Sequence, residues 1–177
     1  MKEQGELTAF VREVVLPGGP RARPRLDPAA CRFRLRAGRS PIHRWGLFAA
    51  EAIPARRRVI EYTGQHIGPR EAMRRNIRPH IYLFRTGARR YIDGAIGGSG
   101  AEYINHSCEP NLTARIRKGR VTLVSLRPIE KGEELLYDYR LGGGTCGLPC
   151  LCRTPSCRGT MTLARPDTGN GPAASKP

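Results

Sequence analysis

Residues 103 to 111, Tyr-Ile-Asn-His-Ser-Cys-Glu-Pro-Asn, place several side chains able to do chemistry in one short segment. Two amides, an imidazole, a hydroxyl and a thiol offer many hydrogen-bond donors and acceptors among few apolar neighbours. Such a segment makes a poor ordinary strand, and taken alone it is equally typical of a polar loop. Its function therefore depends on which other residues of the chain lie beside it.

A second candidate site is a group of cysteines near the end of the chain. Cys150, Cys152 and Cys157 supply three thiolates in one loop, and structural zinc takes four tetrahedral ligands. The N-terminus lacks the uninterrupted apolar stretch of a secretory signal peptide, so a metal site is favoured over a disulfide framework. Cys31 stands apart and is interpreted as a small buried apolar residue or an inert surface thiol.

The chain is strongly basic, with 31 Lys and Arg against 15 Asp and Glu in 177 residues and a net charge of +16. The positive charge is concentrated in the first half, whereas residues 93–138 are rich in acids. This pattern predicts affinity for polyanions, although a merely solubilising surface would also explain scattered arginines. The longest apolar runs, such as Val121–Leu126, are far below the ~20 residues of a membrane span, which excludes an integral membrane protein.

Short apolar runs separated by turn residues predict a mostly β fold. Arg70–Arg78 is the one stretch with helical potential, and Pro79 ends it. Residues 1–30 are predicted to form a flexible or loosely docked arm, and residues 164–177 a disordered tail. The strands are expected at Phe33–Leu35, Gly46–Ala49, Val59–Tyr62, Ile81–Phe84, Tyr91–Ile92, Leu112–Ile116, Val121–Leu126 and Glu134–Tyr137.

Five further motifs accompany the segment 103–111, in a fixed order along the chain. They are Arg44-Trp-Gly-Leu-Phe-Ala49, Glu61-Tyr-Thr-Gly-Gln65, Tyr91-Ile-Asp-Gly94, Gly132-Glu-Glu-Leu-Leu-Tyr-Asp-Tyr139 and Cys150-Leu-Cys-Arg-Thr-Pro-Ser-Cys-Arg-Gly159. In this order the motifs resemble a SET-domain protein lysine methyltransferase with a post-SET zinc segment, in a compact form without pre-SET cysteines. The resemblance covers roughly residues 32–161, with a SET domain at 31–140 and the post-SET segment at 141–163.

The resemblance implies a β-clip fold of several small sheets, plus a zinc-bound post-SET loop. In this fold the segment at Asn105 and His106 threads beneath Glu134–Tyr139 as a pseudoknot. S-adenosylmethionine and the target lysine would enter a narrow channel from opposite faces. The fourth zinc ligand would be Cys108, with Cys146 as the competing assignment.

The resemblance also assigns the site residues. Tyr139 would be the catalytic tyrosine, with Tyr62 and Tyr137 as further walls of the lysine channel. A hydroxyl at Tyr137 can hold a water that blocks further methylation, so a mono- or dimethyl-lysine product is expected. Tyr137→Phe should raise the methylation state of the product. The residues expected to contact the cofactor are Arg44, Trp45, Gly46, Tyr82, Asn105 and His106.

Position 102 departs from the family, because Glu102 stands where an arginine is usual. Beside Glu133 and Glu134 it would form a cluster of negative charges that raises the pKa of one carboxylate and lowers the activity of the enzyme, unless Arg115 or Arg117 supplies the missing positive charge.

The function expected from the resemblance is methyl transfer to a lysine of a protein tail: a histone, or a nucleoid or ribosomal protein. The alternative is a basic zinc-bearing module that binds nucleic acid and has weak or lost catalysis. Since a chain of charge +16 repels a basic tail, either local acids (Glu102, Glu109, Glu133, Glu134) bind the substrate or DNA or a nucleosome supplies the attraction. The expected location is the cytoplasm, nucleus or nucleoid, with delivery to a host by a non-Sec route if the source is bacterial.

Overall fold

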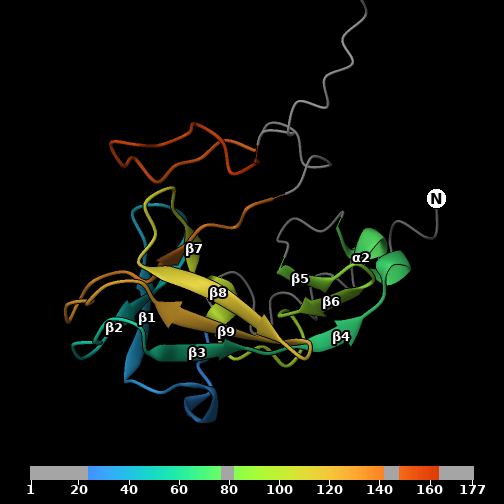
Figure 1. The fold of residues 1–177 in the computed structure, drawn as a ribbon, viewed down its shortest axis with the longest axis horizontal. Coiled ribbons are helices and arrows are strands. Elements are labelled where there is room, and N and C mark those ends of the chain that lie inside the picture. The colour runs from blue at the N-terminus through green and yellow to red at the C-terminus, as the bar shows by residue number, and fades with distance from the viewer. Residues whose placement is uncertain (1–23, 77–81, 142–147, 164–177) are drawn as a thin grey trace, which may run out of the picture.

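A computed structural model describes residues 24–76, 82–141 and 148–163 of the chain (Figure 1). Its described part is mostly short strands, as the sequence predicts. The helices are η1 (Pro28–Ala30), α2 (Pro69–Arg75) and η2 (Ala101–Tyr103). The strands are β1 (Leu35–Arg39), β2 (Trp45–Ala49), β3 (Arg58–Tyr62), β4 (Gln65–Ile67), β5 (Leu83–Gly87), β6 (Arg90–Asp93), β7 (Asn105–His106), β8 (Leu112–Arg117), β9 (Arg120–Ser125) and β10 (Leu136–Tyr137).

The largest sheet has five strands in the order β3-β9-β8-β10-β7. Strand β10 lies between β7 and β8, although these two follow each other in sequence, and it runs parallel to both. Tyr137 is paired with His106 on one side and with Leu112 on the other. Strand β10 is thus inserted between two strands that precede it in sequence. This is the threading predicted for the segment at Asn105 and His106 and the segment Glu134–Tyr139.

A tight hairpin joins β8 to β9. Its two loop residues, Lys118 and Gly119, both have left-handed backbones with φ of 51° and 78°. Two residues with positive φ form the turn whose twist matches that of the flanking strands. The hairpin sets the register of the sheet that carries β10.

Two smaller sheets flank the large one: β1 pairs with β2, and β4, β6 and β5 form the other (Figure 1). Helix α2 is shorter than predicted and has Asn76 as its C-cap, while Pro79 and Ile81 lie outside the described residues. The helix is anchored by Arg75, whose guanidinium donates to the buried carboxylate of Asp93 at 2.7 Å.

The core lies between the sheets and contains the apolar residues that the strand pattern predicts to be inside. Part of the predicted N-terminal arm contacts it: Leu26 packs against the core, and the amide of Asp27 donates to the carbonyl of Ser99 at 2.9 Å. Within the described ranges, the structure has no helix with the length and apolar character to cross a membrane. The fully buried large apolar side chains are Leu47, Ile53, Ile60, Ile92, Ile104, Leu112, Leu123, Ile129 and Leu135.

Candidate active site

Aromatic side chains from three segments, β3, β5 and the β10 segment, meet in one place. The ring centroids of Tyr137 and Tyr139 lie 4.7 Å apart, those of Phe84 and Tyr137 6.1 Å, and those of Tyr62 and Phe84 5.1 Å. The alternation of the β10 segment places Tyr137 and Tyr139 on one side of the chain. We call Tyr62, Phe84, Tyr137 and Tyr139 the aromatic cluster.

Two of its hydroxyls are held by backbone carbonyls. Tyr62 donates to the carbonyl of Tyr82 at 2.7 Å, and Tyr139 donates to that of Ile104 at 2.8 Å. Within the described part of the chain the Tyr137 hydroxyl has no hydrogen-bond partner, although the residue is only 9% exposed. A buried hydroxyl without a protein partner is a place where a water or a ligand amine binds.

All three phenols keep their protons at neutral pH. Burial raises the pKa of Tyr62 and of Tyr137 well above the ordinary value, and that of Tyr139 is raised for the same reason. Negative charge on any one of them would also face the neighbouring tyrosines. The cluster can therefore orient a ligand by hydrogen bonds, but it supplies no phenolate base.

Asn105 is the buried connection between β7, β10 and the residues before β2. Its side-chain nitrogen donates to the carbonyl of Trp45 and to the carboxylate of Glu134, both at 2.9 Å. Glu134 also accepts from the Ser40 hydroxyl at 3.0 Å. These bonds hold the exposed turn at Arg44, which has a left-handed φ of 43°, against the β7 edge of the sheet.

Gly46 has a structural reason to be glycine. A Cβ at this position would collide with the carboxylate of Glu134, so the missing side chain makes room for the bond between Glu134 and Asn105. Next to it the half-buried ring of Trp45 carries the guanidinium of Arg39 at 4.5 Å from its centroid. A larger residue at 46 would therefore disturb the turn that Asn105 positions.

His106 joins the aromatic cluster to the cysteines. Its Nδ1 accepts from the backbone amide of Tyr139 at 3.1 Å, and its Nε2 lies 3.6 Å from the sulfur of Cys108. Burial lowers the pKa of His106, so the ring is neutral near pH 7. With Nδ1 accepting, the ring proton is assigned to Nε2, where it faces the sulfur.

Cys108, Cys150, Cys152 and Cys157 form one cluster, with all four sulfurs within 4.8 Å of one another. The sulfurs of Cys108 and Cys150 are 3.7 Å apart. Zn–S bonds of about 2.3 Å in a tetrahedron place thiolates about 3.8 Å apart, so the cluster fits a zinc ion. Cys31 lies outside this cluster, and Cys146 is not among the described residues.

Backbone amides and ion pairs hold the cysteine segment in place. The amides of Arg158 and Gly159 donate to the sulfurs of Cys108 and Cys157, each at 3.4 Å, as is usual around zinc-bound thiolates. The Arg158 guanidinium forms two bonds to Asp138, of 2.9 and 2.8 Å. Asp138 lies between the two tyrosines of the β10 segment, so the cysteine segment is tied directly to the aromatic cluster.

Glu102 lies near Tyr62 and Tyr82, and not among Glu133 and Glu134. One of its carboxylate oxygens accepts from the Gly100 amide at 2.8 Å, and burial raises its pKa to about 7. Glu133 is paired with Arg127, and Glu134 with Asn105. The carboxyl has the raised pKa expected, but desolvation causes it, and no cluster of like charges forms.

The SET domain family matches residues 44–140, more than half of the chain. The chain belongs to the SET domain family. The match begins at Arg44 and ends just after Tyr139, so it contains the turn, the aromatic cluster and the bonds of Asn105.

Three sequence relatives of this SET domain share the words histone-lysine N-methyltransferase in their names. It is 39% identical over 140 residues to "Histone-lysine N-methyltransferase set1" of Dictyostelium discoideum, which covers 73% of this chain and 9% of that protein. It is 41% identical over 138 residues to human "Histone-lysine N-methyltransferase SETD1A", covering 72% of this chain and 8% of the relative. It is 40% identical over 136 residues to "Histone-lysine N-methyltransferase, H3 lysine-4 specific" of Saccharomyces cerevisiae, covering 70% and 13%. The chain thus spans about a tenth of these relatives.

Solved structures agree on the fold. "Crystal structure of an active polycomb repressive complex 2 in the basal state" matches with a TM-score of 0.58 and 35% identity, over 60% of this chain and 15% of that one. "ctPRC2 in an autoinhibited conformation bound to S-adenosylmethionine" matches with a TM-score of 0.58 and 32% identity, over 63% and 16%. The SET fold predicted from the motifs is confirmed.

Within this SET domain the predicted residues form three adjoining groups. Tyr62, Tyr137 and Tyr139 belong to the aromatic cluster, Arg44, Trp45, Gly46 and Asn105 to the turn beside it, and His106 to the bridge toward the cysteines. Tyr82 contributes a carbonyl to Tyr62, and its ring lies 5.5 Å from that of Tyr103. Their roles in binding or catalysis stay predictions.

The sequence did not predict the structural role of three residues that hold the site together. Phe84 completes the aromatic cluster, Glu134 links Asn105 to Ser40, and Asn111 pairs through its buried side chain with the backbone of Leu136 and Glu134. Asn111 had a signal, since it closes the polar segment 103–111. Phe84 had none, because an aromatic residue in a short apolar run is ordinary core.

Proposed function

We propose that this SET domain transfers a methyl group from S-adenosylmethionine to the side-chain amine of a lysine in a histone. The observation that carries the proposal is the aromatic cluster, with its unpartnered Tyr137 hydroxyl, beside the turn that Asn105 holds. Relatives named histone-lysine N-methyltransferase support both the reaction and the substrate class. A solved neighbour bound to S-adenosylmethionine supports the methyl donor.

The residues present fit such a donor. S-adenosylmethionine supplies a methyl group on a sulfonium centre that is already activated for displacement. Aromatic faces, hydroxyls and carbonyls suit a cation, and the cluster consists of these groups. We assign the donor to the turn at Arg44, Trp45 and Gly46, together with Tyr82, Asn105 and His106, and the lysine amine to the aromatic cluster.

The chain's own residues then have to align and desolvate the amine. Exclusion of water from the buried site disfavours the charged ammonium form and lowers the pKa of the lysine, so the amine reaches its attacking form more easily. Tyr139 is fixed by its bond to the Ile104 carbonyl, which fixes one wall of the channel. In the displacement the amine nitrogen bonds to the methyl carbon as the carbon–sulfur bond breaks, and the amine's proton leaves to water.

The Tyr137 hydroxyl supports a limit on the number of methyl groups that the lysine receives. A water held there occupies space that further methyl groups on the amine would need, so we propose mono- or dimethyl-lysine as the product. Zinc would be held by the four clustered cysteines and would act structurally, fixing the segment that Arg158 ties to Asp138.

The expected binding module with lost catalysis is not favoured. The residues that would perform catalysis, Tyr139, Asn105 and His106, have well-formed contacts that a binding relic has no need of. We place the protein in the nucleus on chromatin, since the relatives named above act on histones by name. Those relatives come from eukaryotes and lend no support to a bacterial source or to delivery into a host.

The test is methyl transfer from isotope-labelled S-adenosylmethionine to recombinant core histones, read by mass spectrometry. We expect label on one or a few lysines as mono- and dimethyl forms. Transfer to a lysine of unrelated basic proteins alone would overturn the histone assignment. Absence of transfer to any lysine, by zinc-loaded protein, would overturn the reaction.

A further inference from the structure

An open pocket of about 610 Å³ on the surface is lined mainly by arginines. Its walls are Arg32 and Phe33, which precede β1, and Arg56, Arg57 and Arg58, which lead into β3. Strand β3 is one edge of the five-stranded sheet and β7, with Asn105 and His106, is the other (Figure 1). We call Arg32, Arg56, Arg57 and Arg58 the arginine quartet.

The loop that carries three members of the quartet is fixed by a buried serine. The hydroxyl of Ser125 donates to the carbonyl of Pro54 at 2.6 Å and accepts from the amide of Arg57 at 2.9 Å. Its backbone carbonyl accepts from the amide of Arg56 at 2.8 Å. Arg56 is held in a left-handed conformation with φ of 61°. Arg32 is fixed to the same place, since its amide donates to the carbonyl of Val59 at 2.9 Å.

No hydrogen bond or ion pair in the described part of the chain reaches the four guanidinium groups of the quartet, and all four residues are exposed. Glu61 is the acid that Arg32 and Arg58 influence, since both lower its pKa, but its carboxylate is hydrogen-bonded to Arg120. Between residues 24 and 62 the chain has nine arginines and three acidic residues. Each acidic side chain is already bonded, to a backbone amide, to Arg34 or to Arg120. The positive charge of the pocket is therefore available to an external anion.

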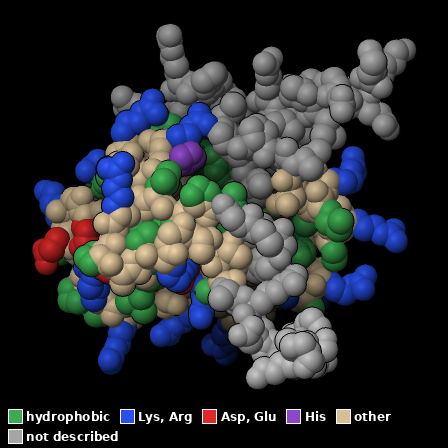
Figure 2. Space-filling model, turned by 90° about the horizontal axis from the view of Figure 1, so that it is seen from above, with side chains coloured by type: hydrophobic (Ala, Val, Ile, Leu, Met, Phe, Trp, Pro, Cys, Tyr) green, Lys and Arg blue, Asp and Glu red, His purple; other side chains and the backbone are tan. Residues whose placement is uncertain are grey.

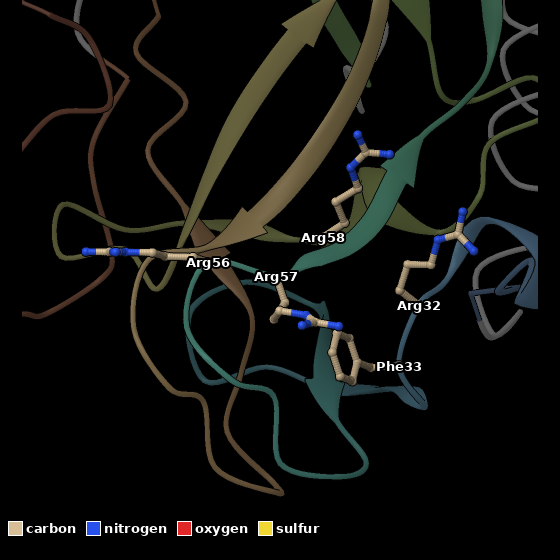
Figure 3. Close-up of a pocket in the computed structure, with 5 residues that line it drawn as sticks. All are labelled: Arg32, Phe33, Arg56, Arg57 and Arg58. Carbon is tan, nitrogen blue, oxygen red and sulfur yellow. The ribbon is translucent and has the colours of Figure 1, made fainter.

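The directions of the four side chains point to an extended anion. Figure 3 shows the Arg57 side chain directed toward the ring of Phe33, the Arg32 and Arg58 side chains both directed to the upper side of the view, and the Arg56 side chain extending away from the other three. Guanidinium groups spread in this way fit a row of phosphates better than one small anion, and each can bond a phosphate with two N–H groups. The net charge of +16 adds a long-range attraction that is greatest for the most densely charged polymer.

We propose that the arginine quartet binds the phosphate backbone of double-stranded DNA. The contacts of the four predicted local acids favour this partner. Glu102, Glu109, Glu133 and Glu134 all bond within the fold, to Gly100, Ser156, Arg127 and Asn105. A basic histone tail, the substrate class that rests on the proposed function, therefore gains little attraction from them. DNA bound at the β3 edge would instead attract the basic tail to the domain.

The experiment measures binding of a fluorescent 20-base-pair duplex by anisotropy between 50 and 300 mM salt. The variant replaces the quartet with glutamine (Arg32→Gln, Arg56→Gln, Arg57→Gln, Arg58→Gln). We expect it to bind roughly 100-fold more weakly at 100 mM salt and to lose about 3 to 4 from the slope of log affinity against log salt. The bonds of Ser125 involve only backbone groups of the loop, so the fold is kept.

The matched control removes the same charge outside the pocket, by Arg85→Gln on β5, Arg90→Gln on β6, and Arg115→Gln and Arg117→Gln on β8, all of them exposed. It should weaken DNA binding less than about fivefold. A lysine quartet, which keeps the charge, should retain the salt slope. Equal losses in both glutamine variants would overturn the proposal, and so would a loss seen with poly-glutamate but not with DNA. Because no methyl donor is present, the result is independent of the proposed methyl transfer.

Discussion

We expect the single hydroxyl of Tyr137 to set the methylation state of the product. The side chain is buried in the aromatic cluster, and its oxygen has no partner in the described part of the structure. Tyr137→Phe removes the site for a water and leaves the ring in place. We expect the variant to shift the main product by one methyl group, measured as the ratio of mono-, di- and trimethyl-lysine by mass spectrometry.

The control for this change is Tyr103→Phe, which removes a hydroxyl from a half-buried tyrosine whose ring pairs with Tyr82, outside the cluster. Its product ratio should equal that of the unchanged protein. Trimethyl-lysine as the main product of the unchanged protein would contradict the role given to Tyr137.

Glu102 makes stability depend on pH in the direction opposite to most acidic residues. Its folded pKa is about 7, above the ordinary 4.5, so the folded protein holds this proton more tightly than the unfolded chain. Stability is therefore lost as pH rises from about 4.5 to about 7. Glu102→Gln keeps an acceptor for the Gly100 amide and removes the buried charge. We expect it to raise the free energy of unfolding at pH 8 by roughly 2 to 3 kcal/mol, with little change at pH 4.5.

Urea unfolding at the two pH values measures this difference. Glu130→Gln, the same chemical change at an exposed site, should alter stability by less than about 0.5 kcal/mol at both. An equal effect of Glu102→Gln at pH 4.5 and pH 8 would show that the carboxyl is not desolvated in the way described.

At the scale of elements, the cysteine segment and the β10 segment form one unit. Cys108 sits two residues after His106, which accepts from the Tyr139 amide, and Arg158 binds Asp138. We expect the purified protein to contain about one zinc ion, and its removal by a chelator to raise hydrogen exchange at residues 148–163 and to lower methyl transfer at least tenfold.

Two single cysteine variants separate this effect from general damage. Cys157→Ser should lose zinc, while Cys31→Ser, outside the cluster, should keep it. Full activity of a zinc-free protein would contradict the structural role assigned to the metal.

The elements differ in how far the sequence predicts them. Apolar runs predict the bounds of β8 and β9 closely; β9 is mostly buried in the large sheet, whereas β8 is buried at Leu112 and becomes exposed toward the hairpin. Strand β4 (Gln65–Ile67) was not predicted, since its residues are mostly exposed and it forms only by pairing with β6. Helix α2 ends before the predicted Pro79, at the Asn76 C-cap. A short strand such as β4, which forms by pairing with a distant segment, leaves no periodic pattern of apolar residues in the sequence.

The candidate site follows the same rule. Motif residues that carry chemistry, such as Tyr139 and His106, stand out by type and order along the chain. The residues that support the site, such as Phe84 beside Tyr137, are ordinary residues whose importance comes from contacts between distant segments. The sequence can therefore name candidate site residues, whereas the residues that position them need the structure.

On the scale of the whole molecule, basic side chains outnumber acidic ones on the surface, and the acids near the aromatic cluster are used in internal bonds. The face shown in Figure 2 carries many Lys and Arg side chains and few acidic ones. The acids near the site are used in internal bonds, as between Asp138 and Arg158 or Glu109 and Ser156. Binding of a basic substrate by the domain alone should therefore be weak, and DNA attached to the substrate should strengthen it.

The most direct test of the account compares Tyr139→Phe with the unchanged protein. The quantities are the rate of methyl transfer to a lysine of histone H3 at saturating S-adenosylmethionine and the affinity for S-adenosylhomocysteine. Because the Tyr139 hydroxyl, which we assign to the wall of the lysine channel, is anchored on the carbonyl of Ile104, we predict a rate about 100-fold lower and an affinity changed less than about threefold. A rate equal to that of the unchanged protein would contradict the assignment of the aromatic cluster as the site of methyl transfer.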